Sequence, residues 1–189
     1  AQNLAILDRL LVMAEVKDTT IAVCLIKIDL DSDGSQRERF AAIYGPLYTT
    51  ICASNITGEG IDELKAFLQG RTSAFAGPSG VGKSTLLNHL GGHILAETGE
   101  VGHKSRRGKH TTRHVELFAI DGGGSVFDTP GFTSFDVLEA EESELAHYFP
   151  EMAPYLGNCR YDDCRHVAEP GCPIRRAAAD GAIAASRYA

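Results

Sequence analysis

The segment 77–84, with the sequence GPSGVGKS, most constrains how this chain can fold. It fits the pattern GxxxxGK[ST] and stands between a short predicted strand at 72–76 and a helical pattern at 83–90. Glycines in such a turn let backbone N–H groups point inward, and the N-terminus of the following helix adds partial positive charge. We therefore expect a phosphate-binding loop here, against the alternative of a plain glycine-rich turn.

Several residues of this segment are predicted to contact a nucleotide: Gly77, Pro78, Ser79, Gly80, Val81, Gly82, Lys83, Ser84 and Thr85. Lys83 would reach the β- and γ-phosphates and take part in catalysis, and the Ser84 hydroxyl would be a ligand of Mg²⁺. Asp128, which begins the sequence DTPG after an expected strand, is the second predicted Mg²⁺ residue. Alone, DTPG is only a strand followed by a turn, but the phosphate loop upstream favours the functional interpretation.

The rest of the chain alternates between strand and helix patterns. Strands are predicted at 19–29, 47–53, 114–120 and 125–128, helices at 37–44, 61–68 and 139–148, and a long loop at 91–112. This alternation indicates an α/β fold with a mostly parallel sheet. Apolar density falls near Pro150, so we expect a nucleotide-binding domain at 1–149 and a small C-terminal module at 150–189.

A candidate base-selecting element lies at the end of the first predicted strand, where Lys27 and Asp29 stand in a form close to the pattern NKxD. The Asp29 carboxylate can accept two hydrogen bonds from guanine, which adenine cannot offer. Ser54 and Asn55 follow the next strand, where a second base-contacting loop belongs. Each of these residues alone is compatible with an ordinary solvated strand end, but together they predict a guanine site.

The order of these motifs is unusual, because the base-selecting elements precede the phosphate loop and DTPG comes last. In this order the chain resembles the circularly permuted GTPases of ribosome biogenesis, specifically the RsgA (YjeQ/YloQ) group. The resemblance extends over LIKIDL, TGEGIDEL, GPSGVGKSTLLNHL, GKHTT, DTPGF and a terminal Cys/His cluster followed by EPGC. It implies that 1–149 is a circularly permuted P-loop GTPase domain with GTP or GDP as its ligand.

The resemblance also implies that the long basic loop at 91–112 and the DTPG segment are the two switch loops. Thr112, or otherwise Thr111, would bind Mg²⁺ and the γ-phosphate, and Gly131 would sense that phosphate. Many GTPases place a glutamine after this glycine, but here the residue is Phe132. His110 is therefore our candidate for orienting the attacking water, against the alternative of a solvated loop histidine.

This sequence departs from the family pattern in two places. Ile26 stands where the family has Asn, so a side chain that would contact guanine and brace the phosphate loop is missing. We predict weakened nucleotide affinity with unchanged base preference. The family also carries an N-terminal RNA-binding OB-fold, to which no segment here corresponds, so we expect a truncated chain.

A second site is predicted near the C-terminus, where the spacing is C-x4-C-x-H-x5-C. Cys159, Cys164, His166 and Cys172 supply three thiolates and an imidazole, enough for closed tetrahedral Zn²⁺ coordination of a structural kind. Buried thiols or disulfides are the alternatives. Cys24 and Cys52 lie within predicted strands and are expected in the core, since no CxxC spacing supports a redox pair.

The composition limits the kinds of partner that this chain is expected to bind. With 43% hydrophobic and 23% charged residues and no apolar run near the roughly 20 needed to cross a bilayer, the chain is expected to be a soluble, cytoplasmic monomer without a membrane partner. Its net charge of −7 leaves only local basic patches for RNA. The resemblance implies the small ribosomal subunit and its rRNA as partners, with basic residues of the switch loop and of the C-terminal module contacting phosphates.

The leading hypothesis is GTP hydrolysis coupled to late maturation of the small ribosomal subunit. In it, the GTP or GDP state controls the switch loops and the position of the zinc module. The alternative is a guanine-nucleotide-binding regulatory module with negligible hydrolysis. A P-loop ATPase or small-molecule kinase is disfavoured by Asp29 and by the lack of a substrate lid.

Overall fold

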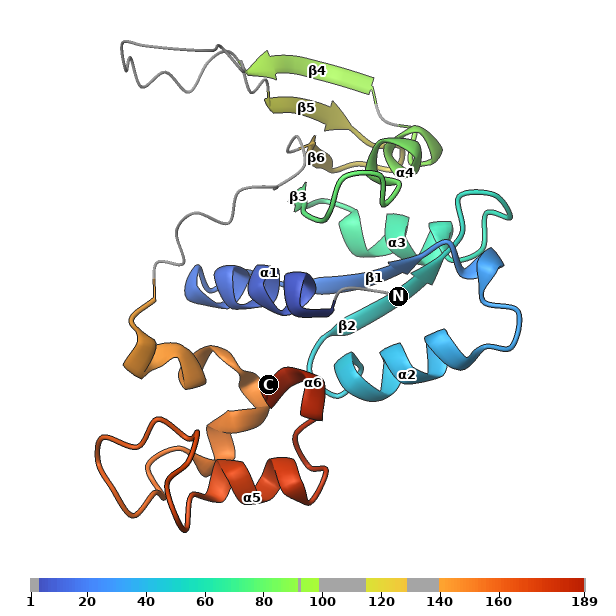
Figure 1. Cartoon of the computed structure of the whole chain (residues 1–189). Coiled ribbons are helices and arrows are strands. Elements are labelled where there is room, and N and C mark those ends of the chain that lie inside the picture. Colours follow the sequence, from blue (N-terminus) through green and yellow to red (C-terminus); the bar gives the residue numbers. More distant parts are fainter. Residues whose placement is uncertain (1–3, 92, 99–114, 129–139, 189) are drawn as a thin grey trace, which may run out of the picture. The chain divides into compact units, whose positions relative to one another are not determined.

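The computed structural model describes residues 4–91, 93–98, 115–128 and 140–188 (Figure 1). Contacts divide the chain into two compact units. Unit 1 is Ala1–Val23, Phe40–Thr49 and Phe135–Ala189, and unit 2 is Cys24–Arg39 and Thr50–Ser134. Among the described residues, no helix is both long enough and apolar enough to cross a membrane.

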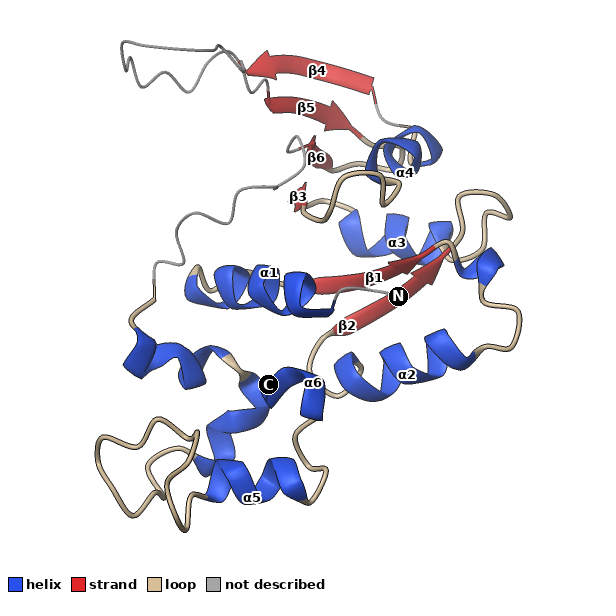
Figure 2. Ribbon diagram, in the orientation of Figure 1, coloured by secondary structure: helices blue, strands red, loops and turns tan. Residues whose placement is uncertain are grey.

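Unit 2 contains a four-stranded sheet in the order β3-β6-β5-β4. Its strands, drawn red in Figure 2, are β3 (Thr72–Phe75), β4 (His93–Thr98), β5 (Val115–Ala119) and β6 (Ser125–Asp128). β3 and β6 pair in parallel, whereas β5 pairs antiparallel with both β6 and β4. Helix α4 (Lys83–His89) follows β3 and buries Leu86 and Leu87. The sheet is therefore mixed rather than mostly parallel as predicted.

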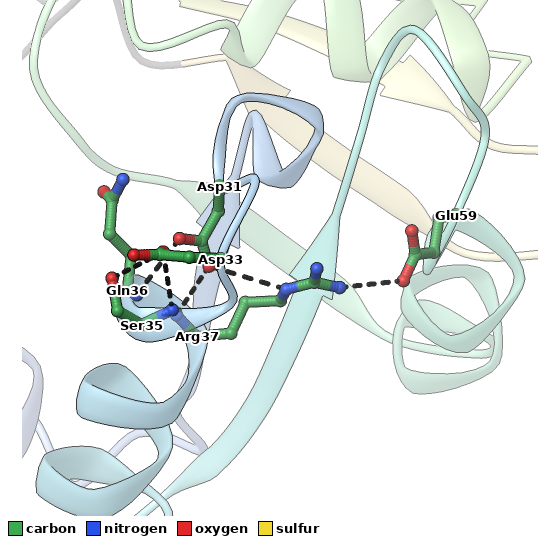
Figure 3. A network of polar contacts seen from close by, with 6 residues as sticks. All are labelled: Asp31, Asp33, Ser35, Gln36, Arg37 and Glu59. Carbon is green, nitrogen blue, oxygen red and sulfur yellow. Dashed lines mark hydrogen bonds and ion pairs between the residues drawn. The ribbon is translucent and has the colours of Figure 1, made fainter.

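A second sheet pairs β1 (Ala22–Ile26) with β2 (Thr49–Ala53), and η1 (Ile28–Leu30) follows β1. The Asp31 carboxylate secures the first turn of helix α2 (Ser35–Tyr44), because it accepts the backbone N–H groups of Gln36 and Arg37 at 3.1 and 2.9 Å. The Arg37 guanidinium lies between Asp31 and Glu59, at 3.5 and 3.3 Å (Figure 3). This network ties the segment after β1 to the loop after β2.

Helix α3 (Ile61–Leu68) repeats the predicted stripe, with Ile61, Leu64 and Leu68 buried. Its N-cap, Gly60, has φ +75, and a Cβ there would lie 1.9 Å from the carbonyl oxygen of Cys52. Only glycine fits this approach of the helix start to β2.

Unit 1 combines α1 (Leu4–Val16) with η2 (Glu142–Tyr148), η3 (Pro150–Tyr155), α5 (Pro173–Ala179) and α6 (Ala185–Tyr188). A small core forms around Met152, Cys172, Ile174, Ala177 and Ile183. Residues 150–189 thus share a unit with α1.

Several predicted elements differ from the structure. The first strand is only 22–26, because Lys27 turns to φ +63 and a 3₁₀ turn follows. Residues 142–148 form a 3₁₀ helix rather than an α-helix. The loop predicted at 91–112 contains β4, which sequence analysis missed because a register irregularity between Ile94 and Ala96 disturbs its alternation.

Candidate nucleotide site and metal centre

The phosphate loop of unit 2 runs from the end of β3 to the start of α4, as the motif predicts. Residues 78–80 are exposed, and Gly82 is the N-cap of α4 with φ +115. The Lys83 ammonium donates to the carbonyls of Gly77 and Pro78 at 2.8 and 3.1 Å. Its charge is therefore held against the loop, within reach of a phosphate bound there.

Ser84 and Thr85 are the second and third residues of α4, and both are exposed. Asp128, the last residue of β6, lies opposite Phe75 in the parallel register. Because Phe75 is the last residue of β3, the end of β6 lies beside the start of the phosphate loop. The backbone thus brings the predicted Mg²⁺ residues Ser84 and Asp128 to the same edge of the sheet.

The predicted base-selecting residues also lie beside the phosphate loop. Lys27 reaches it directly, because its Nζ donates to the Gly80 carbonyl at 3.2 Å. Lys27 holds a left-handed backbone at φ +63, which is costly for a residue other than glycine and is commonest at functional sites. Asn55 Nδ2 donates to the Gly82 carbonyl at 3.2 Å.

Asp29 is anchored by Ser54, whose Oγ donates to Asp29 Oδ1 at 2.6 Å. Ser54 is fully buried, and its Oγ accepts the backbone N–H groups of Ile56 and Thr57, both at 3.1 Å. Asp29 itself is exposed. Ser54 thus orients the Asp29 carboxylate, which remains accessible to a ligand.

The other predicted site residues are His110, Thr111, Thr112, Gly131 and Phe132, which lie outside the described residues.

The predicted metal-binding residues of unit 1 come together. One ligand atom from each of Cys159, Cys164, His166 and Cys172 can be chosen so that all lie within 4.8 Å of one another. His166 Nδ1 is 3.5 Å from Cys159 Sγ and 3.4 Å from Cys172 Sγ, and these two sulfurs are 3.9 Å apart.

These separations fit a tetrahedral ion. Zinc bonds of about 2.3 Å to sulfur and about 2.0–2.1 Å to nitrogen place neighbouring sulfurs about 3.8 Å apart and sulfur and nitrogen about 3.6 Å apart. All the cysteines are free thiols, so the disulfide alternative is not realised. Burial and hydrogen bonds with the Cys164 and Cys172 thiols raise the pKa of Cys159 to about 12, so an ion must displace its proton to bind.

Glu169 orders the loop that carries His166. Its carboxylate accepts the backbone N–H groups of Arg165, Val167 and Ala168, each at 2.9 Å. These bonds, the first of them from Arg165, lower the pKa of Glu169 to about 2. The Tyr188 hydroxyl donates to the His166 carbonyl, and His166 has φ +64. The imidazole therefore sits on a backbone held from two sides.

Comparison with known proteins identifies the family to which this chain belongs. A family profile described as RsgA GTPase matches residues 1–138. The chain belongs to the RsgA GTPase family. The resemblance drawn from the order of the motifs is thus confirmed.

Curated relatives in this family are named small ribosomal subunit biogenesis GTPase RsgA. The protein of Geobacillus thermodenitrificans is 47% identical over 187 residues, covering 97% of this chain and 63% of the relative. The protein of Ruminiclostridium cellulolyticum is 44% identical over 184 residues, covering 97% and 60%. The chain thus spans about three-fifths of the length of these RsgA proteins.

Solved structures show the same fold. YjeQ from Thermotoga maritima has a TM-score of 0.78 and 37% identity, over 99% of this chain and 63% of that one. YloQ, described as a circularly permuted GTPase, has a TM-score of 0.75 and 33% identity, over 100% and 60%. The predicted fold class, a circularly permuted P-loop GTPase domain, is therefore confirmed.

Sequence analysis missed two contributors to these sites. No motif predicts the hydrogen bond from Asn55 to the phosphate loop, although a polar residue after β2 was expected to contact the base. Glu169 was overlooked because it is not a ligand. Its signal was its place in the sequence HVAEPGC, three residues after His166 and three before Cys172.

Cys24 and Cys52, which were expected in the core, are only partly buried thiols. Burial, then the proximity of Cys52 and Glu63, raises the pKa of Cys24 to about 11, and burial also raises the pKa of Cys52. Both therefore stay protonated near neutral pH, where a redox pair would need a thiolate.

Proposed function

We propose that this chain binds GTP with Mg²⁺ and hydrolyses it to GDP and phosphate, as part of a protein that acts in maturation of the small ribosomal subunit. The observation that carries the proposal is the tethering of two loops. Lys27 bonds the Gly80 carbonyl and Asn55 bonds the Gly82 carbonyl, so Asp29 is held beside the phosphate loop. A base and its phosphates are thereby given binding groups within one compact unit.

Guanine is the base that this site suits. Asp29, with Oδ1 fixed on Ser54, presents an acceptor to the N1–H and amino groups of guanine, and adenine has no such pair of donors. Ile56 follows these loop residues and is 82% exposed, which leaves apolar surface for a flat ring.

At the phosphate end, the loop N–H groups and Lys83 would hold the β- and γ-phosphates in place. Ser84, Asp128 and Thr112 would hold Mg²⁺, which neutralises charge on the phosphate oxygens. Water would attack the γ-phosphorus as the bond to the β-phosphate oxygen breaks, and His110 would orient that water. Loss of the γ-phosphate would release Gly131 and the switch loop.

The C-terminal module at 150–189 would be structural, with Zn²⁺ held by Cys159, Cys164, His166 and Cys172. DTPG leads into this part of the chain, so we propose that the nucleotide state sets the position of the module, in a cytoplasmic protein whose basic loops contact rRNA. Distances between spin labels in the two parts would be compared with GDP and with a non-hydrolysable GTP analogue. Identical distances would contradict this coupling.

The decisive test is base selection. Calorimetry of the purified chain with Mg²⁺ should show GDP binding at least about a hundredfold tighter than ADP, and Asp29→Asn should remove most of the difference. Lys83→Ala should abolish single-turnover GTP hydrolysis, while Lys65→Ala in α3 serves as the matched control. Equal affinity for GDP and ADP would refute the guanine assignment.

The regulatory alternative, nucleotide binding with negligible hydrolysis, is favoured by Phe132 at the position of the usual glutamine. Single-turnover assays with and without small ribosomal subunits separate the two. Hydrolysis that stays at the uncatalysed rate in both would favour the alternative.

A further inference from the structure

The position at which this chain departs from its family faces the phosphate loop. Ile26 is the last residue of β1, and its Cδ1 lies 3.4 Å from where a Cβ on Gly82 would stand. An alkyl group there fills space but offers no hydrogen bond. From the sequence we therefore expect that the phosphate loop lacks the support that an asparagine at this position would give it.

The same glycine is nevertheless braced from a different strand. Asn55, in the loop after β2, donates its Nδ2 to the Gly82 carbonyl at 3.2 Å, and this nitrogen lies 3.1 Å from the same Cβ position on Gly82. The carbonyl also accepts the Leu86 N–H at 2.9 Å in the first turn of α4. The amide of Asn55 therefore secures the N-terminus of the helix that follows the phosphate loop.

The amide has one group left over. Asn55 Oδ1 is buried and has no hydrogen-bond partner among the described residues. A buried acceptor without a donor is costly, and native structures hold few of them. Such an atom beside a ligand loop is suited to accept a donor that arrives with the ligand.

We propose that Asn55 is a positioning residue that replaces the missing asparagine at position 26, tying the base-selecting loop to the phosphate loop from β2 instead of β1. The proposal rests on the guanine-nucleotide site proposed above. It means that Ile26 is compensated within this chain, so its nucleotide affinity is less weakened than the sequence predicts.

The test is a double-mutant cycle at positions 26 and 55, read as the dissociation constant for GDP with Mg²⁺ on the full chain. Asn55→Ala should weaken GDP binding roughly three- to tenfold, the worth of one neutral hydrogen bond. Ile26→Asn added to Asn55→Ala should restore affinity to within about twofold. Asn88→Ala, at an exposed position of α4 in the same unit, is the matched control and should leave affinity unchanged.

Asn55→Asp serves as a second variant of nearly equal size, in case alanine impairs folding. Its carboxylate would repel the Gly82 carbonyl, so it should weaken GDP binding at least as much as alanine does. Thermal unfolding reports whether each variant is folded.

Two results would overturn the proposal: GDP affinity of Asn55→Ala within twofold of the unaltered chain, or no recovery when Ile26→Asn is added to a folded Asn55→Ala. Titrating ADP in parallel distinguishes failure of this inference from failure of the guanine assignment. If the unaltered chain does not prefer GDP, the guanine site and this inference both fail. If it does and position 55 has no effect, the inference alone fails.

Discussion

Arg187, in the last helix of unit 1, provides the sharpest stability prediction. Its guanidinium is fully buried and holds Glu151 through two bonds, at 2.7 and 3.0 Å, and Asp8 through one of 2.9 Å. It also lies 4.8 Å from the centre of the Phe149 ring. Burial disfavours its charge, but the hydrogen bonds to Glu151 and Asp8 outweigh this and raise the pKa of Arg187 further above its ordinary value.

Arg187→Met keeps most of the apolar stem but removes the cation. It leaves two carboxylates whose side chains are 10% and 8% exposed without their partner. Removing one member of a buried ion pair costs about 3–5 kcal/mol, a large part of the roughly 5–15 kcal/mol that stabilises a domain. At about 2–4 °C per kcal/mol for a chain of this size, the melting temperature should fall by roughly 6–20 °C.

The chain contains its own control, the Arg165–Glu142 pair. That pair has a similar separation of 3.1 Å, but its side chains are 70% and 76% exposed. Arg165→Met should therefore cost less than about 1 kcal/mol. Urea unfolding of the zinc-loaded chain, followed by circular dichroism, measures both variants under the same conditions.

Salt separates the two pairs further, because it screens exposed charges much more than buried ones. Raising the salt from 0.05 to roughly 0.5 M should remove what little Arg165→Met costs and leave the cost of Arg187→Met largely intact. If the two variants lost equal stability, burial of the Arg187 network would not be the source of its energy and the reasoning would fail.

Other predictions follow from single contacts. Ser54→Ala removes the bond that orients Asp29, so calorimetry should show GDP affinity lowered about tenfold; an unchanged affinity would exclude that role. Gly60→Ala should cost about 1–3 kcal/mol more than Gly58→Ala in urea unfolding, because the two glycines have φ +75 and +78 but only the methyl at Gly60 would strike a carbonyl of β2. Chelation of zinc should unfold the C-terminal module, and Glu169→Gln should speed zinc release in a colorimetric chelator assay; equal release rates would contradict the ordering role of its carboxylate.

The sequence predicted those parts of the site whose chemistry is local. The phosphate loop, the start of α4 at Lys83 and the strand Ser125–Asp128 were all placed correctly, because glycines, a strand pattern and a helix pattern adjoin there. The spacing of the cysteines and the histidine likewise predicted a metal site, and in the structure the four ligand atoms lie close together. Each of these features depends on neighbours in the chain.

What escaped prediction depends on contacts between distant segments. β4 is a strand because it pairs with β5, and its own pattern is too irregular to show this. The first strand ends at Ile26 because Lys27 turns into the left-handed region and sends its ammonium to a loop 53 residues away in sequence. No local pattern encodes the partner of such a side chain.

The tethers of the nucleotide site share a design that accounts for the departure at Ile26. Lys27, Asn55 and Lys83 each donate from a side chain to a main-chain carbonyl of the phosphate loop. Every residue has such a carbonyl, so a substitution that keeps the backbone conformation of the loop leaves the acceptor in place, and the donor can come from whichever neighbouring element reaches it. An asparagine can therefore be lost at the end of β1 and its bond regained from the loop after β2, provided that position 82 remains glycine. The geometry of the loop, rather than the identity of the donor, is then what constrains the sequence at this site.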